Sequence, residues 1–190
     1  MKKLLLLVIS LTMVLLANAQ VSVQVGFLSN TLKAENKEVG KLAGTYRGVM
    51  AAVDYNIHLT DYLGVAPGLG VDYSFNNNSG LKYQELGLFA PIDVNYCLSQ
   101  GSTFSLSLFA GPTLYYGIFS KETYENKSYD NFAENYSKRF DVSLGGGFWL
   151  DFYEMIRFKL GYKFGLTNTS KIADIVERNN FLSISVGYVF

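Results

Sequence analysis

Charged side chains recur at alternate positions inside several apolar stretches of this sequence. The acidic members are Asp54, Asp72, Glu85, Asp93, Asp141 and Asp151, and the basic members are Arg157, Lys159 and Lys163, with Arg139 further out. Paired carboxylates can carry out general acid–base chemistry. Alternatively, the two signs neutralise one another inside a filled interior, because unpaired buried charges are too costly to keep. We favour mutual neutralisation.

Nucleophilic or metal chemistry has little support in the sequence. His58 is the only histidine and Cys97 the only cysteine, and no histidine stands beside Cys97 in the chain. A cysteine nucleophile needs a base beside it. The sequence contains no metal-ligand cluster, phosphate-binding loop or Gly-x-Ser-x-Gly turn. We therefore expect no enzymatic activity, no catalytic residue, no metal and no cofactor.

The sequence contains eight segments in which apolar and polar residues alternate, as in β-strands, and the charged positions fall on five of them. The clearest runs from Ile156 to Thr167, where Arg157, Lys159 and Lys163 alternate with apolar residues. The predicted strands are Val21–Leu28, Thr45–Ile57, Leu63–Phe75, Lys82–Leu98, Thr103–Ile118, Lys138–Asp151, Ile156–Thr167 and Phe181–Phe190.

The connections between these strands alternate in length. The connections after the odd-numbered strands are mostly long and polar: Asn30–Gly44, Asn76–Leu81, Phe119–Ser137 and Asn168–Asn180. The others are short: His58–Tyr62, Ser99–Ser102 and Phe152–Met155. Long loops at one rim and tight turns at the other are typical of outer-membrane barrels with both termini in the periplasm.

Glycine indicates which face of the barrel is outside. A soluble lipocalin-type barrel would bury the apolar face. Twelve glycines share the polar face instead, as the crowded interior of a narrow barrel requires: Gly26, Gly48, Gly64, Gly68, Gly70, Gly87, Gly111, Gly145, Gly147, Gly161, Gly165 and Gly187. Tyrosines near strand ends suit an interfacial girdle: Tyr46, Tyr55, Tyr73, Tyr96, Tyr116 and Tyr188. The prediction is an all-β, eight-stranded antiparallel up-and-down transmembrane β-barrel.

Both ends of the chain indicate export. Lys2 and Lys3 precede the apolar run 4–16, and Ala17-Asn18-Ala19 has the form of a signal-peptidase site, so we predict a signal peptide over 1–19, cleaved before Gln20. Residues 20–190 then form one barrel domain. Removing the two lysines leaves 14 basic and 16 acidic residues, which gives no reason to expect nucleic-acid binding.

Three prolines and one loop stand out. Pro67, Pro91 and Pro112 lie inside predicted strands, where we expect local bulges because proline cannot donate to a ladder.

The loop Phe119–Ser137 interleaves aromatic and charged residues, and its candidate binding residues are Tyr124, Tyr129, Phe132 and Tyr136. Tyrosine-rich polar loops suit recognition. The alternative is a hairpin that merely continues above the membrane.

The sequence also predicts how the interior is arranged. Placing Asp151 opposite Arg157 and Trp149 opposite Lys159 keeps both lumen faces in register and puts an ion pair at the periplasmic rim. Asp54, Asp93, Asp151, Arg157 and Lys159 should lie in the lower half, and Asp72, Glu85, Asp141, Arg139 and Lys163 in the upper half. Each level then holds both signs, with Phe89, Phe109, Tyr115 and Trp149 filling the space between them.

The last ten residues carry a resemblance to known proteins. Leu182, Ile184, Val186, Tyr188 and Phe190 share one face of a strand that ends on an aromatic, which resembles the carboxy-terminal assembly signal of outer-membrane barrels, with Tyr188 and Phe190 as its aromatic members. Over the mature chain the sequence resembles small eight-stranded barrels of the OmpX, OmpA-barrel and OmpW kind, including the short outer-membrane barrel proteins of Bacteroidetes.

The resemblance implies a bacterial outer-membrane location. Its implied partners are outer-membrane lipid and lipopolysaccharide, the barrel-assembly machinery and an unidentified extracellular ligand. Our first hypothesis is a non-enzymatic structural or adhesive barrel that binds through its outer loops. The alternatives are a narrow conduit for small or apolar solutes and a lipid-A-modifying enzyme, which the predicted periplasmic position of His58 disfavours.

Overall fold

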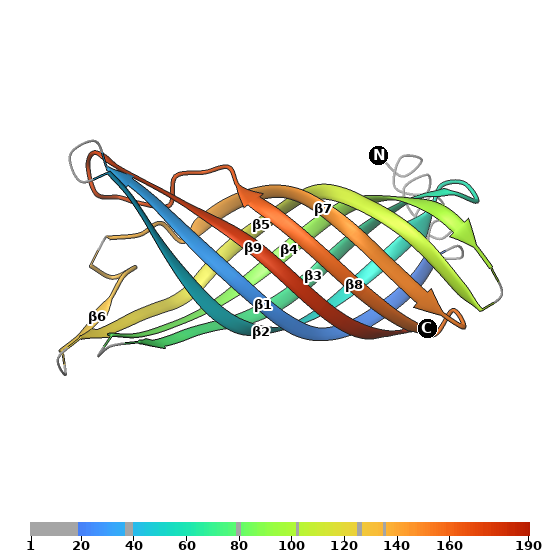
Figure 1. Cartoon of the computed structure of the whole chain (residues 1–190), viewed down its shortest axis with the longest axis horizontal. Coiled ribbons are helices and arrows are strands. Elements are labelled where there is room, and N and C mark those ends of the chain that lie inside the picture. Colours follow the sequence, from blue (N-terminus) through green and yellow to red (C-terminus); the bar gives the residue numbers. More distant parts are fainter. Residues whose placement is uncertain (1–18, 37–39, 79–80, 102, 125–126, 135) are drawn as a thin grey trace, which may run out of the picture.

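The strands form a closed, tilted barrel in the computed structural model, which describes residues 19–36, 40–78, 81–101, 103–124, 127–134 and 136–190 (Figure 1). The strands are β1 Ala19–Asn36, β2 Gly40–His58, β3 Leu63–Asn78, β4 Leu81–Gln100, β5 Phe104–Tyr124, β6 Lys127–Asp130, β7 Phe140–Phe152, β8 Ile156–Gly165 and β9 Ile175–Val189. The signal peptide predicted over 1–19 covers residues 1–18, which lie outside the described residues.

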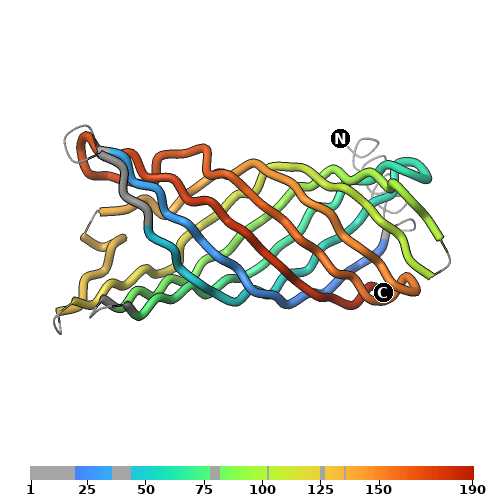
Figure 2. Tube along the Cα trace, in the orientation of Figure 1, coloured from blue at the N-terminus to red at the C-terminus, as the bar shows by residue number. Residues whose placement is uncertain are grey.

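All neighbouring strands pair antiparallel, and eight of them close into a ring. The order is β4-β3-β2-β1-β9-β8-β7-β5, and the pairing of β4 with β5 completes the circle. First and last strands meet along Ser22↔Val189 to Asn36↔Ile175, which seals the barrel (Figure 2). The short β6 only adds a hairpin to the end of β5. The predicted eight-stranded up-and-down barrel is confirmed.

The two faces of each strand have the predicted character. Outward residues are apolar and exposed, such as Phe27 at 73% and Ile184 at 57%. Inward residues are polar or charged and buried, such as Asp93 at 0% and Arg157 at 2%. An exposed apolar band around a polar interior is stable only when the band faces lipid. In the described part of the chain, we find no helix with the length and apolar character needed to cross a membrane.

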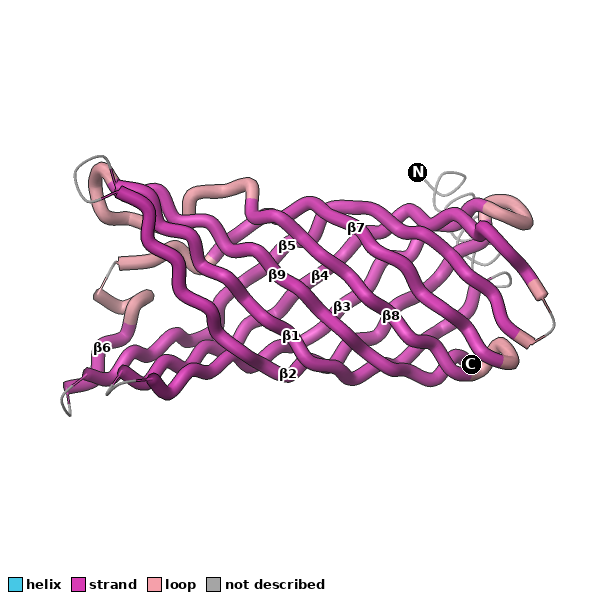
Figure 3. The backbone as a smooth tube through the Cα atoms, in the orientation of Figure 1, coloured by secondary structure: helices cyan, strands magenta, loops and turns pink. Residues whose placement is uncertain are grey.

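The barrel is much taller at one end than sequence periodicity suggests. The C-terminus lies at the right end of Figure 3, beside the short turns, and the blue start of β1 lies at the same end in Figure 1. At the left end several strands, β1 and β2 among them, project beyond the rest of the barrel. Most of the loop predicted over Asn30–Gly44 is paired strand, because β1 continues to Asn36 and β2 begins at Gly40. Beyond Leu28 the outward positions of β1, such as Thr31 and Lys33, are polar, so the apolar outer face ends although the ladder continues.

The bulges predicted at Pro67, Pro91 and Pro112 are wrong. Each proline lacks a partner on one of its two neighbouring strands. There two successive residue pairs are missing from the described ladder, which then resumes in the same register. On its other edge each proline keeps a partner. A missing N–H therefore removes local bonds, while the flanking pairs hold the register. The described register shifts lie elsewhere, at Leu86/Gly87 and Cys97/Ser99.

One residue of the predicted tyrosine girdle is misplaced. Tyr96, Tyr116 and Tyr188 are exposed on the outside at 52%, 50% and 44%. Tyr46 instead packs against Tyr83, with ring centroids 4.2 Å apart, and lines a cavity at the tall end of the barrel. Its even number in β2 places it on the same face as Gly48 and Asp54, so strand parity assigns it to the interior.

Candidate functional site

The lowest charged layer of the lumen is built by the hairpin β7–β8. Asp151 lies opposite Arg157 and Trp149 opposite Lys159, which confirms the predicted register. Arg157 holds Asp151 through two parallel bonds, Nε–Oδ1 at 2.7 Å and Nη2–Oδ2 at 2.9 Å. Its guanidinium carbon also lies 4.3 Å from the centre of the Trp149 ring. The bidentate pair and the ring fix the guanidinium at the end of the barrel that carries the short turns.

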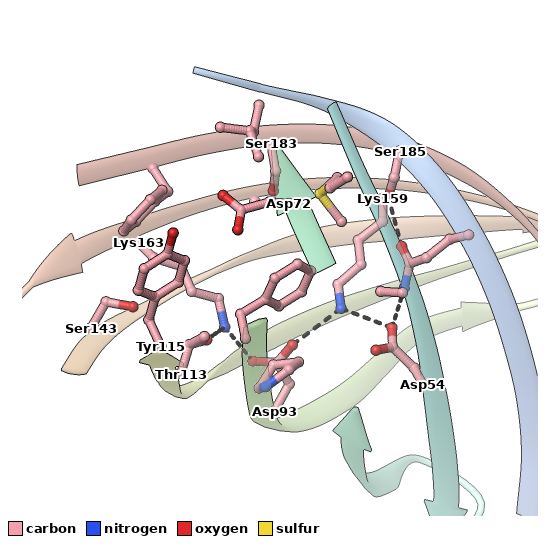
Figure 4. Close-up of a pocket in the computed structure, with 18 of the residues that line it drawn as sticks. Asp54, Asp72, Asp93, Thr113, Tyr115, Ser143, Lys159, Lys163, Ser183 and Ser185 are labelled. Carbon is pink, nitrogen blue, oxygen red and sulfur yellow. Dashed lines mark hydrogen bonds and ion pairs between the residues drawn. The ribbon is translucent and has the colours of Figure 1, made fainter. Parts of the chain in front are cut away.

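A second layer joins four strands across the lumen. Lys159 Nζ lies 3.2 Å from Asp54 Oδ2 and 3.1 Å from Asp93 Oδ2 (Figure 4). Lys163 Nζ lies 2.8 Å from Asp93 Oδ1 and donates to Thr113 Oγ1 at 2.7 Å. These bonds connect β8 to β2, β4 and β5, so they brace opposite walls of the barrel.

Aromatic rings fill the space beside the second layer. Phe109 stacks on Trp149 with ring centroids 5.5 Å apart and planes 17° apart. Lys159 Nζ lies 4.5 Å from the centre of the Phe109 ring. Phe109 and Trp149 are 4% and 1% exposed. Ion pairs and rings together close the lower lumen with protein atoms, as the narrow ring of eight strands favours.

The upper half of the lumen is not neutralised, so this part of the sequence prediction is wrong. None of the ion pairs among the described residues reaches Asp72, Glu85 or Asp141. The side chain of Lys163 points toward the lower lumen, where its Nζ pairs with Asp93. Arg139 lies at the rim, where its Nη1 donates to the carbonyls of residues 117 and 118 at 3.1 Å and 2.6 Å.

Neutral donors take the place of cations around two of these upper acids. Tyr115 Oη donates to Glu85 Oε1 at 2.7 Å, and the Tyr83 hydroxyl also donates to Glu85. Thr167 donates to Asp141. Asp72 differs from both, since its Oδ1 is buried with no hydrogen-bond partner among the described residues.

Glycines make room for the large rings of the lumen. A Cβ at Gly87 would lie 2.0 Å from Tyr115 Oη, and one at Gly70 would lie 2.2 Å from Phe89 Cζ. Tyr115 therefore passes over Gly87 to reach Glu85. This close approach explains why glycine stands at positions 70 and 87 of the polar face. Tyr83, Tyr115 and Thr113 have the inward parity of their strands, so parity could have identified them as partners of the charged groups.

Two cavities lie above the salt bridges. The inner one, of about 90 Å³, is lined by Asp72, Phe89, Tyr115 and Phe181, with Lys159 and Lys163 also in its wall. The mouth cavity, of about 290 Å³, is lined by Tyr46, Tyr83, Glu85, Tyr115, Glu122, Phe132, Tyr136, Lys138, Asp141 and Glu177, among others. Tyr115 belongs to both walls. Burial, reinforced by the charge of Glu122, raises the pKa of Glu177 at the mouth.

The first part of the loop Phe119–Ser137 is the strand extension that the sequence left open as the alternative to a recognition loop. In it, Lys121↔Asp130 to Tyr124↔Lys127 pair as a hairpin. Tyr124, Tyr129 and Tyr136 are exposed at 51%, 38% and 43%.

Phe132 does not belong to the exposed loop surface. It is only 8% exposed and lies over Gly117, where a Cβ would be 2.3 Å from its Cζ, so its assignment to a surface binding group is wrong. The guanidinium of Arg139 covers its ring at 4.7 Å.

His58 and Cys97 lie at the end of the barrel with the short turns. His58 is exposed, and its Nε2 lies 3.2 Å from Asn56 Nδ2. Cys97 Sγ lies 3.5 Å from the carbonyl oxygen of Ser99. Both line a cavity of about 90 Å³ together with Asp61 and Ser107. Within the described residues, no group of three His, Cys, Asp or Glu side chains is placed to hold a metal ion.

A ring of eight antiparallel strands with an apolar outside and a charged inside defines an outer-membrane β-barrel protein. Residues 16–171 match the family model described as outer membrane protein beta-barrel domain, and the chain belongs to this family. Its residence in the outer membrane follows from that membership. A search of curated proteins finds no significant match.

Solved structures with this fold resemble the chain at low identity. One is the attachment invasion locus protein Ail of Yersinia pestis in complex with the heparin analogue sucrose octasulfate, at 14% identity, 91% coverage of this chain, 99% coverage of Ail and a TM-score of 0.52. Neisserial surface protein A matches at 14% identity, 87% and 96% coverage and a TM-score of 0.50. The outer membrane enzyme PagL matches at 12% identity, 90% and 98% coverage and a TM-score of 0.47.

Proposed function

We propose that this protein is a non-enzymatic outer-membrane barrel that binds an extracellular protein through the hairpin β5–β6. The observation that carries the proposal is the height of this hairpin. A barrel strand crosses the bilayer with about 9–11 residues, whereas β5 has 21 and continues into β6. Roughly half of β5 therefore lies outside the bilayer core.

The exposed face of the hairpin has the composition of a recognition surface. Tyr124 and Tyr129 provide broad amphipathic rings that lose little side-chain entropy on binding. Lys127 pairs with Tyr124 and Glu122 pairs with Tyr129, so the face that carries the two rings also offers both signs of charge. The backbone N–H groups of Ala133 and Phe132 bind the Asp130 carboxylate at 3.0 Å, lower its pKa and hold the turn in a fixed shape. A preformed surface of this kind reduces the entropy lost on binding.

The filled lower lumen supports a binding role over the conduit alternative. Lys159 joins Asp54 to Asp93 directly beneath the inner cavity, and Trp149 and Phe109 stack below this pair. A continuous water column would require these buried bonds to open together, which is costly when the charges are desolvated.

The chemistry of the described residues also favours a binding protein over a lipid-modifying enzyme. His58 is the only imidazole in the sequence, and it lies at the end of the barrel opposite the tall hairpin. A catalytic histidine acting on outer-leaflet lipid would have to lie at the other rim.

Export and assembly complete the proposal. The mature protein begins at Gln20 after signal-peptide cleavage, and the assembly machinery recognises the outward-facing Tyr188 and Phe190. Their rings lie 4.8 Å apart with planes at 72°. Both stand beside the seam between β9 and β1, where Phe190 N donates to Val21 O at 2.8 Å. An aromatic pair at this seam is suited to guide closure of the barrel.

Attachment of cells that display the barrel tests the binding proposal. Wild-type cells are compared with the double variant Tyr124→Ser/Tyr129→Ser on surfaces coated with fibronectin, mucin or heparin. We expect attachment to at least one of the two protein coatings, with loss in the double variant and retention in Tyr153→Ser, which changes an exposed tyrosine at the opposite rim. Equal attachment of wild-type and double-variant cells would contradict the role of the hairpin.

A further inference from the structure

Asp72 occupies an unusual position in the lumen. The residue is 3% exposed, and its Oδ1 is buried without a hydrogen-bond partner among the described residues. Figure 4 shows the carboxylate beside the inner cavity with no dashed line to it, whereas Asp54 and Asp93 are joined to lysines. An isolated buried carboxylate is too costly to remain unpaired. Either a cation beside the carboxylate or a proton on the carboxyl itself must therefore offset its charge.

The lysines in the cavity wall are already engaged. Lys163 Nζ is held between Asp93 at 2.8 Å and Thr113 at 2.7 Å. Lys159 Nζ is held between Asp93 and Asp54. Two ammonium groups thus share two carboxylates in the floor of the cavity, and this leaves the charge of Asp72 unbalanced above them.

Further acids surround Asp72 on the side of the mouth. Asp72 pairs with Gly87, and the next inward pair joins Ser74 to Glu85, so Asp72 and Glu85 are diagonal neighbours. Asp141 lies opposite Tyr115 in the ladder between β5 and β7. Above these residues, Glu122 and Glu177 line the mouth. Lys138, the basic residue in that wall, donates to Asn168 O at 2.9 Å. The field along this path attracts cations from outside.

The lining suits an organic cation better than a metal ion. Phe89, Tyr115 and Phe181 surround the inner cavity, and the Tyr115 and Phe181 ring centroids lie 6.0 Å apart. Aromatic faces attract ammonium groups through their quadrupoles. The described residues do not include a trio of His, Cys, Asp or Glu placed to ligate a metal.

We propose that the upper lumen binds a small organic cation carrying a primary ammonium group, which enters through the mouth and pairs with Asp72. The inner cavity of about 90 Å³ accommodates one ammonium head with a short alkyl chain. A second ammonium on the same chain would reach Glu85 and the tyrosines of the mouth. This site is separate from the hairpin surface and goes beyond the proposed binding function.

Titration of putrescine into the folded full-length barrel in detergent micelles tests the site. Isothermal calorimetry should detect saturable binding to wild type, and Asp72→Asn should weaken it about tenfold because a charged partner is lost. Asp61→Asn is the matched control, since it removes an acid from the exposed turn between β2 and β3. Binding to this control should equal that of wild type.

A second variant keeps the test decisive if Asp72→Asn does not fold. Tyr115→Leu removes the ring shared by both cavities and should weaken putrescine binding several-fold. Absence of binding to wild type at millimolar putrescine would overturn the proposal, and would show that Asp72 is accompanied by a proton instead. Unchanged affinity in Asp72→Asn, or in Tyr115→Leu, would also overturn it.

Discussion

Replacing Lys159 with methionine should destabilise the barrel by about 3–5 kcal/mol. Methionine keeps the apolar stem and much of the volume, so the change removes mainly the charge. Lys159 is bonded to Asp54 and Asp93, whose side chains are 2% and 0% exposed, and its own side chain is 12% exposed. This burial places the pair in the range measured for desolvated ion pairs rather than for surface pairs.

The two carboxylates should not contribute equally to this loss. Without Lys159, Asp93 keeps Lys163 Nζ at 2.8 Å, whereas Asp54 keeps only the neutral amide of Gln24 among its described partners. The charge of Asp54, left without a cation, therefore accounts for most of the loss in unfolding free energy. Lys163→Met should cost less, about 1–3 kcal/mol, because Asp93 then retains Lys159.

Urea unfolding in lipid vesicles measures these free energies. Trp149 is the only tryptophan in the chain, and its ring centroid lies 5.5 Å from Lys159 Nζ, so its fluorescence reports on this layer directly. The double variant Lys159→Met/Asp54→Asn should recover most of the lost stability, since the stranded charge is gone. A loss below about 1 kcal/mol for Lys159→Met would indicate a solvated pair. Lack of recovery in the double variant would refute the assignment of the loss to Asp54.

Three other changes test separate parts of the structure. Gly87→Ala should cost roughly 1–3 kcal/mol by urea unfolding, because its Cβ would lie 2.0 Å from Tyr115 Oη. Gly101→Ala at an exposed turn should cost less, because its Cβ would lie 3.2 Å from the nearest atom, Phe104 O. Phe190→Ala should lower the folded, heat-modifiable fraction on gels more than Phe152→Ala does, and equal fractions would argue against an assembly signal at the terminus. Because the pKa of Glu177 is raised in the folded protein, its contribution to the stability of the mouth is fully present below the pKa that Glu177 has in the unfolded chain. This contribution is lost as pH rises through its pKa in the folded protein. Glu177→Gln should remove this dependence in hydrogen exchange of residues 175–180, corrected for intrinsic rates, and an unchanged profile would show that another group titrates.

Periodicity and parity predicted the transmembrane part of the barrel well. Each strand faces lipid on one side and a crowded lumen on the other, so apolar and polar residues alternate along it with a period of two. The short turn between two strands then fixes the register in which they pair. Asp151 and Arg157 could therefore be paired from sequence, and the structure confirms that register. The far ends of the strands could not be predicted, because the outward positions of β1 beyond Leu28, such as Thr31 and Lys33, are polar although they lie on paired strand.

Contacts across the lumen were less predictable than contacts between neighbouring strands. Lys163 is on β8 and its carboxylate partner Asp93 is on β4, on a different part of the ring. Which levels face each other depends on strand tilt and stagger, which the local pattern does not encode. Strand direction places Lys163 in the upper half, but its side chain reaches down to Asp93 and leaves Asp72 without a cation. Tyr46 lies near a strand end, as girdle residues do, but its parity places it inside the barrel.

Single-channel recording in a planar bilayer tests the filled lumen most directly. If Lys159, Asp54 and Asp93 close the barrel together with the stacked Phe109 and Trp149, purified wild-type protein should insert without carrying a steady current. Insertion is verified independently by protease protection in vesicles made from the same lipid. Steady, porin-like conductance through the wild-type barrel would contradict the filled lumen and favour the conduit alternative.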